Sequence, residues 1–387
     1  MGSDRHTTPE PVRPPVSRAP GAPRVVVAMS GGVDSSVAAA LLVQQGYECI
    51  GVTLQVWPSD LPETEREGGC CSLGAVTDAR QVAWALGIPY YVLNYQEIFQ
   101  THVIDDFVAE YRRGRTPNPC IRCNKDIKFA ALLRHAEAIG ASHVATGHYA
   151  RILRDPASGR YLLLRGRDRH KDQSYVLYSL DQEQLAHILF PLGDFTKDQT
   201  RAVAERLGLR VAHKAESQEI CFVPSNNYRD FLGRVAPDVR KPGPILDTAG
   251  RKLGEHPGIA FYTIGQRKGL GLSYCEPLYV VDLDPERNAV IVGTAREVWR
   301  AGLLGSHANW VSVPELAGPL KVEVQIRYNS KPVPARIEPG PGPGQVACYF
   351  DQPQRAVTPG QAAVFYQGDR LVGGATIERP LPVTKAS

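Results

Sequence analysis

Residues 28–36 (AMSGGVDSS) constrain the fold more than any other stretch of the chain. They follow four residues rich in β-branched side chains, 24–27, and precede an apolar run, 37–43, that Gly46 ends. This order predicts a buried strand, a tight turn and a helix. Backbone N–H groups in such a turn and at the helix start face a common point, where they stabilise an anion. We therefore expect residues 28–36, the phosphate loop, to bind phosphate groups.

Asp34 is the unusual member of the phosphate loop, because a carboxylate beside bound phosphates usually needs a metal ion between them. We therefore assign Asp34 to a magnesium ion. The loop lacks the lysine of a Walker loop and the three spaced glycines of the dinucleotide fingerprint. The alternative is a serine-capped helix after a turn, with Asp34 as a first-turn acid. The full nine-residue pattern after a strand favours phosphate binding.

The first half of the chain alternates short apolar runs with longer helical patterns. This alternation predicts an α/β fold in which a parallel sheet carries helices on both faces. Because ligands bind beyond the carboxyl ends of parallel strands, residues 30–36, 54–56 and 147–148 should meet at one mouth. The predicted strands are residues 24–27, 47–56, 90–93 and 143–146, with a hairpin at 150–166. The predicted helices are residues 37–43, 75–86, 97–113, 124–139 with Asn124 as N-cap, and 197–208 after a capping box at 196–199.

The pattern changes after residue 224. Residues 224–300 show short strands and glycine turns, and residues 301–387 alternate apolar and polar side chains between Pro/Gly-rich turns. The second pattern predicts a terminal β-barrel. We therefore divide the chain into a disordered tail (1–22), an α/β catalytic domain (23–222), a small central mostly-β domain (223–300) and a C-terminal β-barrel (301–387).

The tail is rich in proline and arginine and lacks the apolar centre of a secretory signal, and its prolines and acids disfavour a transit peptide. No apolar run in the sequence approaches the length of a membrane span. We therefore expect a cytoplasmic protein with no membrane partner. In that reducing setting the cysteines are expected to be reactive thiols or metal ligands rather than a disulfide framework.

Basic residues gather in residues 111–128 and 151–171, although the net charge is only +4. Such clusters suit a polyanion such as a nucleic acid. They are equally typical of a solvated surface with salt bridges, and charge alone leaves both interpretations open. The first segment contains Arg112, Arg113, Arg115, Arg122, Lys125 and Lys128 against Asp126.

Two of the eight cysteines, Cys120 and Cys123, lie in the first basic segment. Cys123 directly precedes the predicted N-cap Asn124, so the helix start and its basic neighbours would favour a thiolate. A buried structural cysteine and half of a zinc site are the alternatives, and no second cysteine pair supports zinc. We expect Cys49, Cys275 and Cys348 to be buried packing residues and leave Cys70 and Cys71, in the polar loop 58–74, without a role.

Six motifs in a fixed order resemble one known family. Residues 30–35 (SGGVDS) are the signature of the PP-loop ATP pyrophosphatases, which activate a carbonyl oxygen by adenylation. Together with five further motifs they closely resemble the tRNA-specific 2-thiouridylases, the MnmA/TrmU family, from about residue 24 to the C-terminal region. The five motifs are residues 116–119 (TPNP), 123–125 (CNK), 145–149 (ATGHY), 171–174 (KDQS) and 220–222 (ICF).

The resemblance implies that O2 of the wobble uridine in tRNA is adenylated, that a persulfide supplies sulfur, and that 2-thiouridine, AMP and pyrophosphate leave. It implies ATP and Mg²⁺, and as partners a tRNA with a wobble uridine and a persulfide donor, a cysteine desulfurase or relay protein. Cys123 matches the family's nucleophile and Cys221 its persulfide carrier, and the two would form a transient disulfide. We expect a monomer.

The remaining site residues are also assigned by the resemblance, position by position. The ATP-binding positions are Ala28, Met29, Ser30, Gly31, Gly32, Val33, Asp34, Ser35, Leu54 and Gly147. The positions that face the target base are Asn118, Pro119 and Cys120. The positions that contact tRNA are His148, Lys171, Asp172, Gln173, Arg327, Tyr328 and Gln361, the last three in the C-terminal barrel.

One position departs from the family, because many relatives carry aspartate where this chain has Cys120. That substitution leaves the acid or base of the reaction unassigned. An iron–sulfur cluster on Cys120, Cys123 and Cys221 is the alternative to the persulfide route, which we favour. Another enzyme alternative is a PP-loop ligase that acts on a small carboxylate or amide, but such a ligase would not need the cysteine pair or the barrel. The non-enzyme alternative is a tRNA-binding module with a vestigial nucleotide fold, but such a module would not need an intact phosphate loop and both cysteines.

Overall fold

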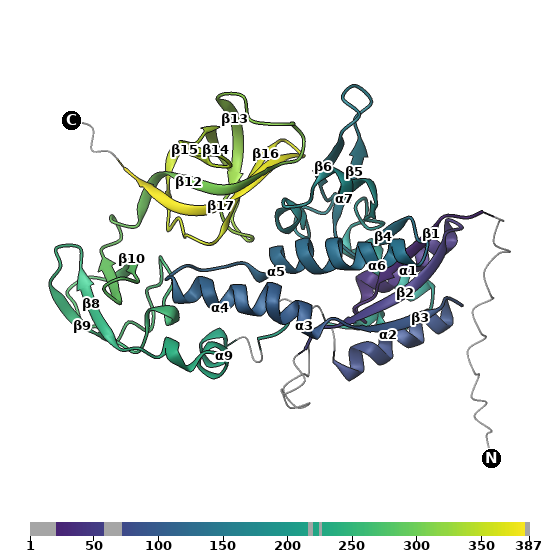
Figure 1. The fold of residues 1–387 in the computed structure, drawn as a ribbon, viewed down its shortest axis with the longest axis horizontal. Helices are drawn as coiled ribbons and strands as arrows, with labels where there is room; N and C mark the ends of the chain where they lie inside the picture. Colours follow the sequence, from purple (N-terminus) through teal and green to yellow (C-terminus); the bar gives the residue numbers. More distant parts are fainter. Residues whose placement is uncertain (1–20, 58–71, 216–219, 224–226, 384–387) are drawn as a thin grey trace, which may run out of the picture.

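The computed structural model describes residues 21–57, 72–215, 220–223 and 227–383. Most of the predicted disordered tail, most of the polar loop with Cys70 and Cys71, and residues 216–219 therefore lie outside the described residues. Figure 1 shows an α/β part on the right, a small strand-rich part on the left and a barrel above, with helix α4 running between the first two. No helix among the described residues is long and apolar enough to span a membrane.

The α/β part is built on a five-stranded parallel sheet in the order β3-β2-β1-β4-β7. The β-branched run predicted at 24–27 forms β1, which lies between β2 and β4. Strand β7 was not predicted, because two residues carry no readable alternation. The strands are β1 (Arg24–Ala28), β2 (Glu48–Gln55), β3 (Tyr90–Asn94), β4 (His143–Ala145) and β7 (Ile188–Leu189).

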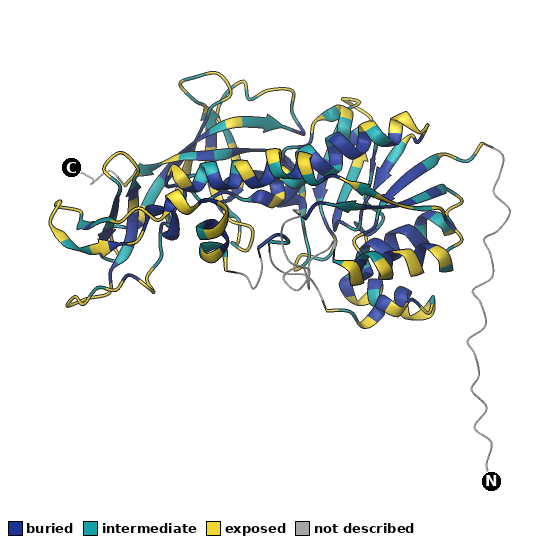
Figure 2. Cartoon of the chain, turned by 60° about the horizontal axis from the view of Figure 1, so that its bottom comes forward, coloured by how far each residue is buried: buried dark blue, intermediate teal, exposed yellow. Residues whose placement is uncertain are grey.

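Helices cover both faces of this sheet, as predicted. On one face, Val25, Val27 and Met29 pack with side chains of α1 (Val33–Gln44), α2 (Leu73–Ala85) and α8 (Lys197–Arg206). On the other face, Val26 packs with α6 (Leu132–Ala138). The predicted capping box at Thr196 and Gln199 starts α8. Figure 2 shows the result, with buried strands between helices whose outer faces are exposed.

A second helical layer connects the α/β part to the rest of the molecule. The predicted helix 97–113 is present as three consecutive segments, α3 (Gln96–Phe99), a π-helical turn η2 (Gln100–Ile104) and α4 (Asp105–Arg112). The predicted start of the next helix at Asn124 is wrong. That helix begins with α5 (Pro119–Arg122) and continues as π-helical η3 (Cys123–Ala131) into α6, because Asn118 accepts from Cys120 N at 3.2 Å and Pro119 occupies the first helical position.

The remaining segments of the α/β part include the predicted hairpin, whose two strands pair antiparallel. After it, the chain passes through short helical turns before and after β7. These segments are β5 (Ala150–Arg154), β6 (Tyr161–Arg165), the 3₁₀ turn η4 (Ser174–Leu177), α7 (Gln182–Ala186) and the 3₁₀ turn η5 (Arg210–His213).

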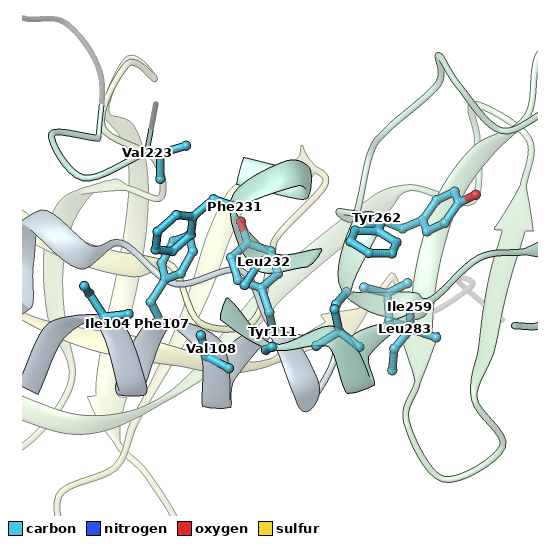
Figure 3. Close-up of a cluster of buried hydrophobic side chains, with 14 of the residues drawn as sticks. Ile104, Phe107, Val108, Tyr111, Val223, Phe231, Leu232, Ile259, Tyr262 and Leu283 are labelled. Carbon is cyan, nitrogen blue, oxygen red and sulfur yellow. The ribbon is translucent and has the colours of Figure 1, made fainter. Parts of the chain in front are cut away.

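The central part contains a four-stranded sheet in the order β10-β11-β8-β9 and one helix that was not predicted, α9 (Tyr228–Val235). Eight residues interrupted by Gly233 give too short a pattern to identify a helix. Figure 3 shows Phe107 and Tyr111 of α4 facing Phe231 and Leu232 of α9 in one buried cluster that joins the two parts. The other elements are η7 (Pro237–Val239), β8 (Gly243–Asp247), β9 (Lys252–His256), η8 (Ile259–Phe261), β10 (Tyr279–Asp284) and β11 (Ala289–Gly293).

The predicted C-terminal β-barrel is confirmed. Six antiparallel strands follow the order β12-β15-β14-β13-β16-β17, and pairing of β12 with β17 closes them. The barrel also meets the hairpin of the α/β part, where Arg370 pairs with Leu164. Its strands are β12 (Trp299–Trp310), β13 (Leu320–Gln325), β14 (Val333–Pro339), β15 (Val346–Arg355), β16 (Ala362–Gln367) and β17 (Arg370–Pro382).

Three cysteines were expected to pack in the core, and two of them do. Cys49 and Cys348 are buried, and burial raises the pKa of the Cys348 thiol far above its ordinary value. The expectation for Cys275 is wrong, because this residue is exposed. It lies in an irregular stretch before β10, between Tyr274 and Glu276, where no strand forms to bury it.

Candidate functional site

The structure brings the phosphate loop, the end of β2 and Gly147 to the same edge of the sheet. Strand β1 pairs in parallel with β2 on one side and β4 on the other, so the segments that follow them are neighbours. Contact is closest at Gly147, where a Cβ atom would lie 2.7 Å from both the Asp34 carbonyl carbon and the Ser35 nitrogen. Only glycine fits such an approach, which gives residue 147 a physical reason to lack a side chain.

The start of α1 has the form that an anion site requires. Its N-cap is Gly32, and no described side chain accepts a hydrogen bond from its first N–H groups. The serines instead support the loop: Ser30 N donates to Ser35 Oγ at 3.1 Å, and Ser36 Oγ donates to Gly32 O at 2.8 Å. The alternative of a serine-capped helix is therefore wrong. The N–H groups of the first turn can therefore donate hydrogen bonds to the oxygens of a phosphate.

Gly31 fixes the shape of the turn. Its φ is +69°, and a Cβ there would lie 2.1 Å from the carbonyl oxygen of Ala75 at the start of α2. We expect Gly31→Ala to destabilise the fold by more than the ~1–2 kcal/mol of left-handed backbone strain, and to impair AMP formation, because the loop must move away from α2. Thermal unfolding and an AMP assay measure both effects.

Gly46→Ala is the matched control for Gly31→Ala. Gly46 has a φ of +88° but no atom within 4 Å of a built Cβ. This variant should therefore show only the backbone strain and keep its AMP yield. Equal losses of AMP formation in the two variants would contradict the role given to the contact between Gly31 and Ala75.

The phosphate loop contains no lysine, yet the fold supplies two from distant segments. Lys197 Nζ, on the first turn of α8, lies 2.7 Å and 2.8 Å from the two carboxylate oxygens of Asp34. Lys214 Nζ donates to Gly31 O at 3.0 Å and to Asp78 Oδ2 at 2.5 Å. Neither lysine could be predicted from the sequence, because contacts across more than 130 residues leave no local pattern. The capping box that places Lys197 at a helix start was the only available signal.

Asp34 and Lys197 form a partly buried ion pair with further polar contacts. The lysine side chain is 9% exposed and the aspartate 34%. The Tyr149 hydroxyl lies 2.8 Å from Asp34 Oδ1 and 3.0 Å from Thr200 Oγ1. The Lys197 ammonium is neutralised by Asp34 here, and it can contact a bound phosphate as a Walker lysine does only when it releases an Asp34 oxygen.

A magnesium ion fits this site only if bound phosphates provide most of its ligands. Within the described ranges, no three His, Cys, Asp or Glu side chains lie together as a metal site. Mg²⁺ commonly uses one or two carboxylates together with substrate phosphates and water, which suits Asp34 as a single protein ligand. Lys197 already contacts both Asp34 oxygens, so the lysine would have to release one of them.

Cys123 and Cys221 pack against the same hydrophobic cluster, the one that joins α4 and α9, and both are half-buried. Leu54, at the end of β2, packs there too, so this cluster connects the cysteines to the edge of the sheet that carries the phosphate loop. Phe222 anchors the segment of Cys221. Its ring centroid lies 5.6 Å from Phe99 and 5.3 Å from Phe107.

Cys123 does not lie at a helix start, so the predicted stabilisation of its thiolate by such a start is wrong. The helix begins at Pro119, so Cys120 occupies its first turn and Cys123 lies beyond it. The guanidinium of Arg122 is directed to Asp106, with its NH2 3.0 Å from Oδ1. Cys120 is exposed. Because the described residues contain no group of three such ligands, we derive no step through an iron–sulfur cluster on Cys120, Cys123 and Cys221.

The residues matched to tRNA contacts divide into surface and interior positions. Arg327 and Tyr328 are exposed at the end of β13, and the Tyr328 ring lies 5.9 Å from that of Tyr175. Asp172 is nearly buried and accepts from Arg165 at 3.1 Å and from Gly166 N at 2.9 Å, so it organises its own loop. Among the others, Lys171, Gln173 and Gln361 are half-buried and His148 is buried.

His148 is held inside the protein rather than on its surface. Its side chain is 8% exposed, its Nδ1 lies 2.7 Å from Thr146 Oγ1, and its ring packs between Phe129 and Phe190. Burial lowers the pKa of His148 well below its ordinary value of 6.5, and the nearby Lys128 ammonium lowers it further. The imidazole is therefore neutral in the folded protein at neutral pH.

This depressed pKa of His148 predicts a pH dependence of stability. Above pH 6.5, the ordinary pKa of histidine, His148 is neutral in both the folded and the unfolded protein. Below pH 6.5, only the unfolded chain takes up a proton at this residue. The free energy of unfolding should therefore fall from about pH 7 to about pH 5, with up to ~1.4 kcal/mol per pH unit from this group. His148→Asn should reduce this dependence of the unfolding free energy on pH. Part of the dependence should remain, because burial also lowers the pKa values of His143 and His256. Denaturant unfolding at several pH values tests this, and an unchanged slope in the variant rules the assignment out.

The basic segment 111–128 is largely neutralised within the protein. Four of its arginines form ion pairs with carboxylates, which agrees with the salt-bridge interpretation and leaves less charge for a polyanion. The pairs are Arg112 with Asp238 at 2.7 Å, Arg113 with Glu110 at 3.3 Å, Arg115 with Glu110 at 2.7 Å, and Arg122 with Asp106 at 3.0 Å. In the second segment, Arg151 and Arg169 both pair with Asp369.

Three known protein families match successive parts of the chain. The tRNA methyl transferase HUP domain matches residues 23–225, the tRNA methyl transferase PRC-barrel domain residues 229–294, and the aminomethyltransferase beta-barrel domain residues 300–377. These matches agree with the parallel sheet, the central strands and the closed barrel described above.

Full-length relatives carry one common name. The tRNA-specific 2-thiouridylase MnmA of Moorella thermoacetica is 59% identical over 353 residues, which cover 91% of this chain and 99% of that protein. The protein of the same name from Heliobacterium modesticaldum is 56% identical over 92% of this chain and 93% of its own length. Among solved structures, a 4-thiouridine synthetase–RNA complex with bound ATP covers 56% of this chain and 51% of its own, with 19% identity and a TM-score of 0.33.

Proposed function

The chain belongs to the tRNA-specific 2-thiouridylase family, and on this premise we propose that it replaces O2 of the tRNA wobble uridine with sulfur in an ATP-dependent reaction. One observation carries the proposal: the start of α1, which no described side chain caps, and the two half-buried cysteines are connected through one edge of the sheet. The phosphate loop and the end of β2 share one edge of the sheet, and Leu54 from that edge packs on the same cluster as Cys123 and Cys221.

Activation comes first, because an amide-type oxygen is a poor leaving group. O2 of the uridine attacks the α-phosphorus of ATP, a P–O bond forms, and pyrophosphate leaves. The N–H groups at the start of α1, with Lys197 and Lys214 beside the loop, stabilise the charge on the departing phosphates. A magnesium ion bound with the triphosphate and Asp34 would add Lewis-acid stabilisation of the same charge.

Sulfur transfer then uses both cysteines. The terminal sulfur of a Cys221 persulfide attacks C2 of the adenylated uridine, and the C2–O2 bond breaks as AMP leaves. Cys123 Sγ, as thiolate, attacks Cys221 Sγ, which releases the terminal sulfur as the 2-thio group and leaves a Cys123–Cys221 disulfide. An external thiol reductant returns both cysteines to the reduced form, so the electrons balance over a full turnover.

The proposal includes its partners and setting. The macromolecular substrate is a tRNA with a wobble uridine, and a cysteine desulfurase or relay protein loads Cys221 with sulfur. Asn118, Pro119 and Cys120 face the target base, and Arg327 and Tyr328 on the barrel contact the RNA. A base in the anticodon loop is extruded into the site at the modest free-energy cost of unstacking. The enzyme works as a cytoplasmic monomer.

Mass spectrometry of the wobble nucleoside tests this function. The purified protein is incubated with tRNA, ATP, Mg²⁺ and a persulfide donor, and the digested tRNA is analysed. We expect 2-thiouridine to form only when ATP is present, with AMP and pyrophosphate in equal yield. AMP formation with a small carboxylate, without any thiolated nucleoside, would assign the chain to another class of adenylating ligase. Loss of activity with an iron chelator under anaerobic conditions would favour the cluster route.

A further inference from the structure

Gln361, directly before β16, directs its side-chain amide into the protein. Its Nε2 donates to Thr116 O at 2.8 Å and to Pro117 O at 3.3 Å. A side-chain amide has two N–H donors, and both lie on backbone carbonyls of residues 115–118, here called the connecting loop. The donors of Gln361 are therefore committed to this loop, although the residue was matched to a tRNA contact.

The neighbours of Gln361 hold the same loop. Thr116 N donates to Pro359 O at 2.9 Å, so residues 359–361 bind Thr116 through its backbone on both sides. Gly360 has a φ of +88°, and a Cβ there would lie 3.0 Å from the Thr116 backbone. Arg115 adds an ion pair with Glu378 of β17 at 3.0 Å. The barrel therefore fixes the connecting loop through main-chain and side-chain contacts together.

The connecting loop leads directly into the helix that carries the catalytic cysteine. Asn118 caps that helix, and Pro119 and Ile121 in its first turn are buried. Ile121 packs in a cluster that also contains Ala362, the residue after Gln361. Because Asn118 both ends the connecting loop and caps this helix, a shift of the loop moves the helix start and, with it, Cys120 and Cys123. Displacements of about 1 Å in a reacting group can slow a reaction by ~10²-fold.

We propose that Gln361 is a positioning residue of the thiolation reaction, which holds the connecting loop and thereby sets the position of Cys123, in addition to the tRNA contact that the resemblance assigns to it. This inference rests on the proposed function for its kinetic test. In this account the barrel is part of the catalytic structure as well as an RNA-binding surface. Removal of the Gln361 amide slows the chemical step even when the enzyme is saturated with tRNA.

Gln361→Met tests the inference, because methionine keeps the length of the side chain and lacks both donors. The matched control is Gln367→Met, since Gln367 Nε2 also donates to a backbone carbonyl, Lys321 O at 3.0 Å, but within the barrel. The measurements are the Kd for tRNA and the single-turnover thiolation rate at saturating tRNA. We expect the rate of Gln361→Met at saturating tRNA to fall by about 10- to 100-fold, whether or not its Kd changes. Gln367→Met should change neither. A weakened Kd with an unchanged rate at saturation would overturn the proposal.

Alkylation of Cys123 by iodoacetamide gives a readout that does not depend on thiolation. Labelling is followed site by site, with exposed Cys275 and buried Cys348 as internal references. We expect Gln361→Met to change the labelling rate of Cys123 by severalfold and to leave both references unchanged. An unchanged Cys123 rate overturns the proposal, as does faster labelling of Cys348, which would indicate general destabilisation. If the wild type makes no 2-thiouridine, the proposed function fails, and this labelling still decides the positional claim.

Discussion

Cys221→Ser is expected to abolish 2-thiouridine formation while tRNA binding is retained. A serine hydroxyl cannot carry a persulfide, so no sulfur reaches C2 even when the uridine is adenylated. Binding should survive, because Phe222, not Cys221, anchors this segment in the ring cluster with Phe99 and Phe107. The measurements are the thiolated nucleoside by mass spectrometry and the Kd for tRNA. Cys275→Ser, at an exposed position, serves as control and should remain active.

Cys123→Ser should fail at a later step than Cys221→Ser. The Cys221 persulfide can still attack C2, but no thiolate is present to cleave the S–S bond. The tRNA should therefore stay covalently attached to Cys221, and added thiol should release it as 2-thiouridine. A denaturing gel with and without reductant detects this adduct. Normal thiolation by Cys221→Ser, or an adduct that forms in that variant, would contradict the assignment of the two cysteines.

Lys197→Met is expected to reduce AMP formation by about 10²-fold or more, since it removes a positive charge next to the departing pyrophosphate. Its ammonium lies 2.7 Å and 2.8 Å from the Asp34 oxygens and is 9% exposed, so it acts in a partly desolvated site. Initial rates of AMP release in the presence of tRNA provide the measurement. Lys252→Met is the control, because its ion pair with Glu255 is exposed and should contribute little.

A double variant separates catalysis from stability at this ion pair. Asp34→Asn alone leaves Lys197 with a neutral partner, and we expect the free energy of unfolding to fall by about 1–3 kcal/mol. This loss is smaller than for a fully buried ion pair, because Asp34 is partly exposed. Combining Asp34→Asn with Lys197→Met should recover part of that stability but none of the AMP formation. Recovery of AMP formation in the double variant would mean that the pair is only structural.

Local patterns in the sequence predicted much of the fold. The β-branched run at residues 24–27 predicted β1, the sequence of residues 196–199 predicted the capping box of α8, and alternation after residue 301 predicted the barrel. Each of these signals is contained within a few neighbouring residues. The convergence of the phosphate loop with Gly147 also followed, because adjacent parallel strands place their carboxyl ends together.

The errors have identifiable physical causes. The helix start was placed at Asn124, although the pair Asn118-Pro119 is itself a start signal, an N-cap followed by proline at the first helical position. Asn124 is instead buried and donates to Val176 O. Lys197, Lys214 and the role of Gln361 could not be predicted, since each depends on contacts between residues far apart in the sequence.

If uridine O2 is adenylated and leaves as part of AMP, a heavy-oxygen label on C2 of the wobble uridine must leave with it. The labelled tRNA is thiolated once by persulfide-loaded enzyme with ATP, and the products are analysed by mass spectrometry. We expect the label to appear in the phosphate group of AMP in an amount equal to the 2-thiouridine formed. Label found in inorganic phosphate, in pyrophosphate or still in the nucleoside would contradict it.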